Sequence, residues 1–229
     1  IISREKRLFQ IYLIIKKNFK INKKPKIIFM GKIFFQPENS NFINLEILKK
    51  NKNRIKNDFS LIDKNKFWSE LGEYKDDYSR FENYKIFKTY LREQLILEIS
   101  KNFKNHFSIF GEDKKNIGLD FLKPIYDEKK INEIYNGNIC VDTGSILGSL
   151  SLHPRSIKIL ENGGLLIQAK QEDSRVIWEE MHERIVFNNI DSLLEGIENN
   201  LSNSKLCNET LGMLFEKFRD SKKKIRDSI

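Results

Sequence analysis

Residues 143–151 form a glycine- and serine-rich segment, and a proline and an arginine follow it closely. Gly144 is a residue that lets a backbone approach a ligand. Pro154 suits the first turn of a helix, and the free N–H groups and dipole of such a turn favour an anion. Arg155 follows, and its planar guanidinium can bind a phosphate through two hydrogen bonds. The segment therefore predicts a site for a diphosphate.

Two further residues of this region are candidates for the same site. Ser149 lies in the loop, and His153 adjoins Arg155 and could donate to a phosphate or a sugar hydroxyl. The alternative is that Arg155 pairs with a neighbouring acid and the loop is only a turn. The loop matches neither GxGxxG nor GxxxxGK[ST], which disfavours a P-loop ATPase and a standard dinucleotide dehydrogenase.

Other candidate residues follow the apolar runs that read as strands. Gly31 ends one run and Lys32 comes directly after it, so we expect this lysine to face a ligand cleft, with a solvated surface lysine as the alternative. Gly111 and Glu112 end the next run in the same way. Further along, the acids at 172 and 173 could contact sugar hydroxyls or belong to an exposed charged loop.

Short apolar runs alternate with segments of helical periodicity. Strands are expected at 26–31, 106–111, 139–142, 165–168 and 183–187, with a brief extended piece at 121–125. Helices are expected at 84–103, 127–135, from 154, at 176–181, 192–201 and 206–224, with Asp127 and Asp191 as caps. This alternation predicts an α/β fold with a Rossmann-like parallel sheet and helices on both faces. Ligands of such sheets bind beyond the carboxyl ends of the strands.

The chain divides into a short leading segment and one domain. Residues 3–20 have apolar side chains at spacings of three and four, so residues 1–24 are expected to form an amphipathic linker helix. Residues 25–229 are expected to form the Rossmann-like domain, which also contains a helix at 41–56. Residues 57–84 are charged and are interpreted as an exposed insertion.

The positive charge is concentrated near the start of the chain. The net charge is +9, and residues 1–60 contain 15 basic and 4 acidic residues. Such a region could contact nucleic acid, an anionic membrane surface or an acidic substrate, or its lysines could simply be solvated. No RNA-binding signature is present, so we expect no nucleic-acid partner. A basic nucleic-acid-binding domain stays the alternative.

The lengths of the apolar runs and the positions of the two cysteines bear on the compartment and on metal binding. No apolar run approaches 18 residues. Cys140 and Cys207 lie far apart, which disfavours a disulfide framework or a metal cluster. We expect a cytoplasmic protein with reduced thiols and no metal site. Its first 60 residues could make peripheral contact with an anionic membrane.

The ordered series of segments resembles the carboxyl-terminal domain of GT-B-fold glycosyltransferases, and most closely the CgeB-like, or spore-coat-type, group. The resemblance spans about residues 25–220, and the order of the segments carries it because no single motif is decisive. The segments are IIFMGK, FSIFG, GLDFLKPIYDEKKINEIYNGNICVDTG, LHPRSIKILENGGLLI and RIVFNNIDSLLEGIENNLSN.

The resemblance implies transfer of a sugar from a nucleotide-sugar donor to an unknown acceptor, without a metal ion and with no cofactor besides the donor. Arg155 and Lys32 would stabilise the leaving diphosphate together with helix-end amides. In the GT-B arrangement the acceptor, and often the base, come from an amino-terminal domain that is not evident in this chain.

One position departs from the family pattern. The family usually has an acid three residues after the arginine, where it holds the donor ribose, and this chain has Lys158 there. Glu161, one turn further along, could replace that acid. Alternatively Lys158 binds a phosphate, or the domain is a non-catalytic relative that kept only the fold.

Overall fold

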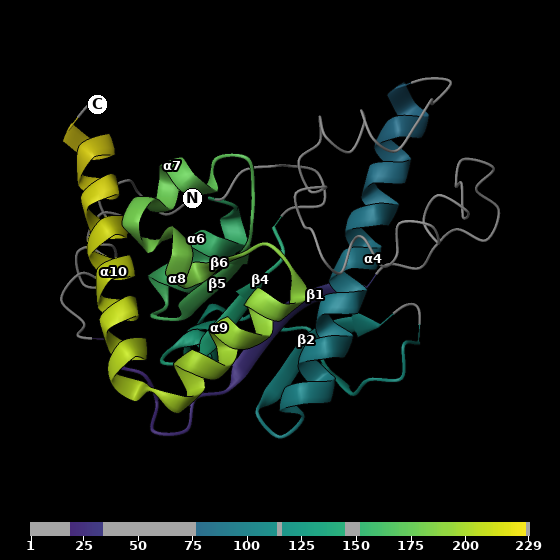
Figure 1. The fold of residues 1–229 in the computed structure, drawn as a ribbon, viewed down its shortest axis with the longest axis horizontal. Helices are drawn as coiled ribbons and strands as arrows, with labels where there is room; N and C mark the ends of the chain where they lie inside the picture. The colour runs from purple at the N-terminus through teal and green to yellow at the C-terminus, as the bar shows by residue number, and fades with distance from the viewer. Residues whose placement is uncertain (1–18, 34–76, 114–115, 145–151, 228–229) are drawn as a thin grey trace.

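A computed structural model describes residues 19–33, 77–113, 116–144 and 152–227, without the side chains of Lys32, 77–87 and 221–227. The expected helix over most of 3–20, the helix at 41–56, most of the expected insertion and Ser149 lie outside these residues. The described part contains a sheet of six parallel strands (Figure 1). This confirms the α/β, Rossmann-like fold class.

The strands lie in the order β3-β2-β1-β4-β5-β6. Their bounds are β1 Ile27–Ile33, β2 Phe107–Asp113, β3 Phe121–Leu122, β4 Ile139–Asp142, β5 Leu165–Ala169 and β6 Val186–Phe187. The chain builds outward from β1 to β3, returns to pair β4 with β1, and then builds outward in the other direction. The order therefore reverses between β1 and β4, and in open α/β sheets ligands bind at such a point, outside the carboxyl ends of the strands.

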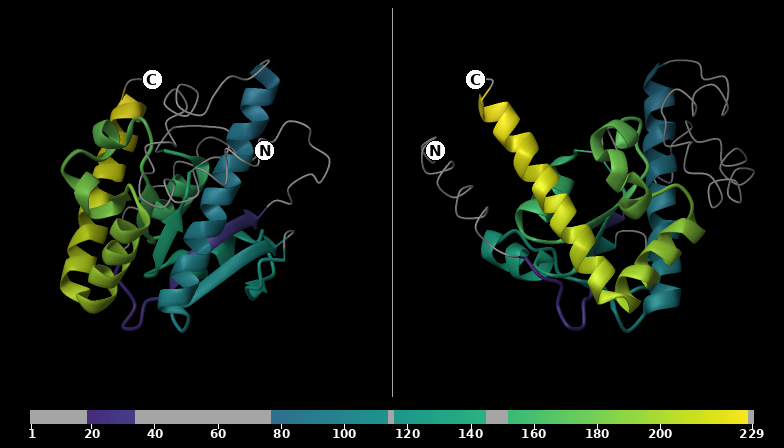
Figure 2. Two further views of the ribbon diagram at one scale, coloured as in Figure 1. Left: turned by 45° about the vertical axis from the view of Figure 1, so that its right-hand side comes forward. Right: turned by 60° about the vertical axis from the view of Figure 1, so that its left-hand side comes forward.

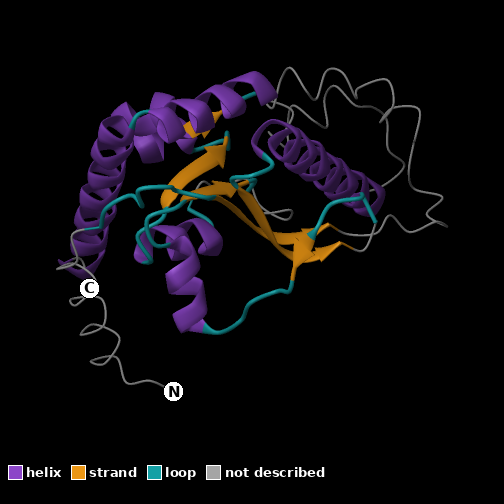
Figure 3. Cartoon of the chain, turned by 90° about the horizontal axis from the view of Figure 1, so that it is seen from below, coloured by secondary structure: helices purple, strands orange, loops and turns teal. Residues whose placement is uncertain are grey.

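Helices cover both sides of the sheet (Figure 3). They are α4 Asp77–Phe103, α5 Glu128–Tyr135, α6 Pro154–Glu161, α7 Ser174–Trp178, α8 His182–Ile185, α9 Ile190–Ser202 and α10 Ser204–Asp227, with a 3-10 turn, η2, at Glu179–Met181. The helix α4 packs on β1 and β2, α9 on β5 and β6, and α6 on β4 and β5. The long helices α4 and α10 lie at opposite sides of the molecule (Figures 1 and 2).

The core forms where these apolar faces meet. Strand residues Ile27, Ile139 and Leu165 are fully buried, as are Leu95 of α4 and Leu193 of α9. Each fully buried aliphatic side chain contributes roughly 1.5–3 kcal/mol relative to an exposed one. No helix within the described ranges is long and apolar enough to cross a membrane.

The sequence suggested that the first two strands end at their glycines, but they do not. Both continue for two residues, so Gly31 and Lys32 pair within the sheet with Gly111 and Glu112. Gly111 has φ +154°, and a Cβ built on it would lie 1.7 Å from the carbonyl oxygen of Gly31. Gly111 therefore allows close pairing of β1 and β2, and the expectation that the two strands end at these glycines is wrong.

Other boundaries also differ from the sequence interpretation. Residues 77–84 were assigned to the exposed insertion, but they form the first turns of α4. Residues 183–185 were assigned to a strand, but they lie in α8, and only Val186–Phe187 pairs with β5. The cap of α9 is Asn189, not Asp191, because the Asn189 side chain accepts the N–H of Ser192 at 2.7 Å while Asp191 lies in the first turn.

Candidate functional site

A buried carboxylate marks the carboxyl end of β4. Asp142 is fully buried and binds three donors from the segments that follow it. Its Oδ2 accepts the hydroxyl of Ser156 at 2.6 Å, and its Oδ1 accepts the N–H of Gly144 at 3.0 Å and Nη1–H of Arg155 at 3.3 Å. Asp142 therefore ties the start of α6 to the end of β4, next to the point where the strand order reverses.

Asp142 stays ionised in spite of its burial. Burial alone would raise the pKa of Asp142, because it disfavours the charged form. The neighbouring His153, the positive charge of Arg155 and the hydrogen bond from Ser156 together outweigh burial and hold the pKa of Asp142 well below its ordinary value. A full negative charge is thus part of the folded site at neutral pH.

His153 caps the helix that carries Arg155. Its Nδ1 accepts the backbone N–H of Arg155 at 3.3 Å, and Pro154 occupies the first helical turn as the sequence predicts. The same Nδ1 lies 3.7 Å from Asp142 Oδ2, which is too long for a direct hydrogen bond. His153 therefore caps the first turn of α6 and lies beside the Asp142 carboxylate.

Arg155 extends from α6 across to β1. Its side chain is 23% exposed, so part of it meets solvent while Nη1 contacts Asp142. A Cβ built on Gly31 of β1 would lie 3.7 Å from its Nη2. Arg155 therefore spans the gap between β4 and β1, although it is also paired with a buried acid, the alternative that the sequence left open.

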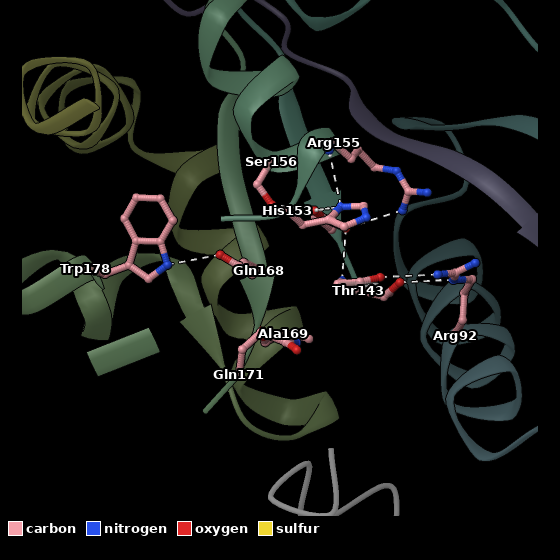
Figure 4. Close-up of polar contacts among 11 residues, drawn as sticks. Arg92, Thr143, His153, Arg155, Ser156, Gln168, Ala169, Gln171 and Trp178 are labelled. Carbon is pink, nitrogen blue, oxygen red and sulfur yellow. Dashed lines mark hydrogen bonds and ion pairs between the residues drawn. The ribbon is translucent and has the colours of Figure 1, made fainter. Parts of the chain in front are cut away.

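A second arginine reaches the same place from α4, on the other side of the sheet end (Figure 4). Arg92 is buried, and its Nε donates to Thr143 Oγ1 at 3.0 Å and its Nη2 to the carbonyl of Gly144 at 3.4 Å. Its guanidinium carbon lies 6.0 Å from the ring centre of Phe29. Burial first, and then repulsion from Arg155, lower the pKa of Arg92 to about 10.

A lysine one turn earlier in α4 adds a third positive group. Lys88 is 5% exposed, and its pKa is lowered to about 8, first by burial and then by repulsion from Arg92, while Glu172 and Asp142 act to raise it. We call Lys88, Arg92 and Arg155 the cationic cluster. A bound anion would offset the repulsion between these positive groups, because an opposite charge nearby stabilises the charged form of each group.

The turn after β4 also contacts the end of β5. Gly144 has φ +75°, and a Cβ built on it would lie 2.7–3.1 Å from the side-chain amide of Gln171. Only a residue without a side chain fits this close approach in this conformation. The amide is held by its own bond to the carbonyl of Ala169 at 3.0 Å. The turn at Gly144 thus joins Asp142, Arg92 and Gln171 into one assembly.

The structure brings some of the predicted site residues together and separates others. Arg155, His153 and Gly144 converge at Asp142, and Gly31 lies beside Arg155. Lys158 instead pairs with the exposed Glu128 of α5 at 2.5 Å, which occupies its ammonium away from Asp142.

The remaining predicted residues lie within a strand or further along α6, or their side chains are not described. Gly111 and Glu112 lie inside β2. Glu161 is the last residue of α6, six residues after Arg155, which places it about 9 Å further along the helix axis. Lys32 lies in β1, where only its backbone is described, and Ser149 lies outside the described ranges.

Sequence reasoning did not single out Asp142, Arg92 or Lys88 as site residues. Asp142 had a signal, since it is an acid directly after a buried strand at the point where ligands bind in such sheets. The two basic residues of α4 had a weaker signal. They stand in an otherwise core-facing helix, and Arg92 lies 51 positions before Thr143, so only the packing of α4 against the sheet brings them to the site.

The site is defined by the chain's own geometry. No protein-family model matches the chain, and no curated protein or solved structure matches it. Among the described residues, no group of three or more His, Cys, Asp and Glu side chains is placed to hold a metal ion. The described residues form an α/β, Rossmann-like domain whose sheet carries a cationic cluster and a buried carboxylate at the reversal of strand order.

Proposed function

We propose that this chain is the donor-binding domain of a glycosyltransferase that uses a nucleotide-sugar and no metal ion. The observation that supports the proposal is the convergence of the cationic cluster at the reversal point of a parallel sheet, where ligands of this fold class bind. Two guanidinium groups and an ammonium group are opposite in charge to a diphosphate and can donate hydrogen bonds to its oxygens. The resemblance of the ordered segments to the GT-B group suggests that this diphosphate belongs to a nucleotide-sugar.

The chemistry proposed for the cluster is electrostatic. Attack of an acceptor hydroxyl on the anomeric carbon breaks the bond from that carbon to the diphosphate oxygen, and the diphosphate leaves with the electron pair. Arg155 and Arg92 would stabilise the negative charge that develops on it. Asp142 would hold the Arg155 guanidinium in position, which lowers the cost of orienting it for each turnover. Lys32, one residue beyond Gly31, stays a candidate for the same role.

A non-catalytic relative is the second candidate. The observation that favours it is the ion pair between Lys158 and Glu128, because the residue in the position of the family's ribose-binding acid points to α5. A domain that kept the anion site and lost the ribose contact would bind diphosphates without selecting a nucleoside. Comparing inorganic pyrophosphate with nucleotides separates the two candidates.

The proposal is tested by thermal shift with UDP-, GDP-, CMP- and dTDP-linked sugars. Binding to the folded state raises Tm in proportion to RT ln(1 + [L]/Kd), so we expect a rise with one nucleotide type. Arg155→Ala should weaken binding roughly 10–100-fold, since charge-assisted hydrogen bonds contribute about 1.5–3 kcal/mol. Arg155→Lys should recover only part of the loss, because it keeps the charge without the two-pronged geometry.

The matched control is Arg175→Ala. Arg175 also binds an acid, Glu183 at 2.8 Å, but it is 73% exposed on α7, so its loss should leave nucleotide binding unchanged. Urea denaturation of each variant checks that it is folded. Undiminished nucleotide binding by Arg155→Ala would overturn the placement of the diphosphate. A salt-sensitive rise with oligonucleotides and none with nucleotide-sugars would instead favour a nucleic-acid-binding domain.

A further inference from the structure

A buried acceptor without a donor lies beside the candidate site. Gln171 follows β5 and is 3% exposed. Within the described part of the chain, its side-chain oxygen Oε1 has no hydrogen-bond partner. Buried polar atoms in native proteins are almost always satisfied, so an orphaned one calls for a specific explanation such as a missing ligand or water.

The orientation of the Gln171 amide is fixed by its other bonds. Its backbone N–H donates to Ser174 Oγ at 2.7 Å, and its Nε2 donates to the carbonyl of Ala169 at 3.0 Å. Exchanging the oxygen and nitrogen of the amide would set two carbonyl oxygens against each other, so Oε1 must be the unpaired atom. The amide is therefore held in place with an acceptor left over.

The position of Oε1 relates it to the cationic cluster. A Cβ on Gly144 would lie 3.1 Å from Oε1, and the same Gly144 donates to Asp142 and accepts from Arg92. Figure 4 shows Gln171 on the β5 side of Thr143 and Arg92 on the α4 side. A phosphate offers only acceptors, so it would be repelled by Oε1 and attracted by the arginines.

We propose that Gln171 Oε1 accepts a hydrogen bond from a hydroxyl of the bound molecule, so that the site selects phosphate esters that carry a hydroxyl over simple polyanions. This inference rests on the proposed function, because it takes the anion to be bound by Arg92 and Arg155. The hydroxyl belongs either to the transferred sugar or to the nucleoside, and both present the same O–H to the amide oxygen.

The test compares three probes by isothermal titration: inorganic pyrophosphate, UDP and UDP-glucose, with the GDP and dTDP pairs run alongside. Gln171→Met keeps the length of the side chain and removes the acceptor. It should weaken binding of the hydroxyl-bearing probes roughly 3–10-fold, the range of a neutral hydrogen bond, and leave pyrophosphate binding unchanged. A loss confined to the sugar-linked form assigns the hydroxyl to the sugar, and an equal loss for UDP and UDP-glucose assigns it to the nucleoside.

Asn200→Leu is the matched control. Asn200 is also a buried amide whose nitrogen donates to a backbone carbonyl, that of Gly196 at 2.7 Å, and whose oxygen has no partner among the described residues. It lies in the last turn of α9, so its substitution should affect stability in a similar way without changing binding of any probe.

The outcomes separate the inference from the proposed function. If wild type binds the nucleotide probes and Gln171→Met binds all three equally well, a water or an internal donor satisfies Oε1, and the inference is overturned while the proposed function stands. An equal weakening of pyrophosphate binding by Gln171→Met would also overturn the inference, because the amide would then affect only the shape of the anion site. If wild type binds none of the probes, the proposed function itself fails, and the inference fails with it.

Discussion

Replacing Asp142 by Asn tests whether a buried charge holds the site together. Asp142 accepts three donors, from Ser156, Gly144 and Arg155, at 2.6, 3.0 and 3.3 Å. The amide of Asn has one acceptor oxygen, so its NH₂ group would face at least one of these donors. The substitution also removes the negative charge that offsets Arg155 and Arg92, which leaves positive charge in a buried setting.

The expected loss of stability is large. Removing one partner of a buried ion pair costs about 3–5 kcal/mol, and we expect the lower part of this range because the Arg155 side chain is 23% exposed and can turn to water. Since the folded-state pKa of Asp142 is lowered, its contribution is fully present above the pKa of the unfolded carboxyl, about 3.9. It is lost as the pH falls below that value toward the folded-state pKa.

Urea denaturation of wild type and Asp142→Asn between pH 3 and 8 measures both effects. With an m value of about 2–3 kcal/mol/M, the midpoint should fall by about 1–2 M at pH 7. The difference should be constant from pH 5 to 8 and should shrink below pH 4. Asp127→Asn is the control, because Asp127 caps α5 at an exposed position where Asn serves equally well. A loss at pH 7 below about 1 kcal/mol would refute the reasoning.

Further predictions concern three positions: Gly111, Lys88 and His153. Gly111→Ala should cost more than about 4 kcal/mol or prevent folding, because its Cβ would overlap the carbonyl of Gly31; Gly118→Ala, with φ +78° and open space, should cost only about 1–2 kcal/mol in a denaturation assay. Pyrophosphate affinity should fall as pH rises through about 8, where Lys88 loses its proton, and titrations of Lys88→Met should show weaker binding without that step. Because the pKa of Lys88 is lowered from 10.5 to about 8, wild type should also gain stability relative to Lys88→Met as pH rises between these values. His153→Ala should lower stability by about 1 kcal/mol through loss of the helix cap, and an unchanged urea midpoint would contradict that role.

The sequence by itself determined the elements and their class. Apolar runs such as 139–142 and 165–168 predicted the buried strands, and Pro154 and Arg155 predicted the start of α6, because periodicity, caps and turn residues act over a few positions. The same local signals failed at Gly31 and Gly111, where both strands continue for two residues and Gly111 permits the close approach of β1 and β2. In the sequence, a glycine at the end of an apolar run looks the same whether the strand stops there or continues through it. Only the pairing with a neighbouring strand distinguishes the two cases.

The tertiary structure alone decided which charges meet. Arg92 and Thr143 are 51 positions apart. Lys158 was a candidate phosphate contact because of its place three residues after Arg155 in the family pattern, but its partner is Glu128, 30 positions earlier. The packing of α4 and α6 around the ends of β1 and β4 sets these pairings. Coulomb energy and hydrogen bonding depend on distances across elements, so the chain order of the residues could not specify them before the sheet was assembled.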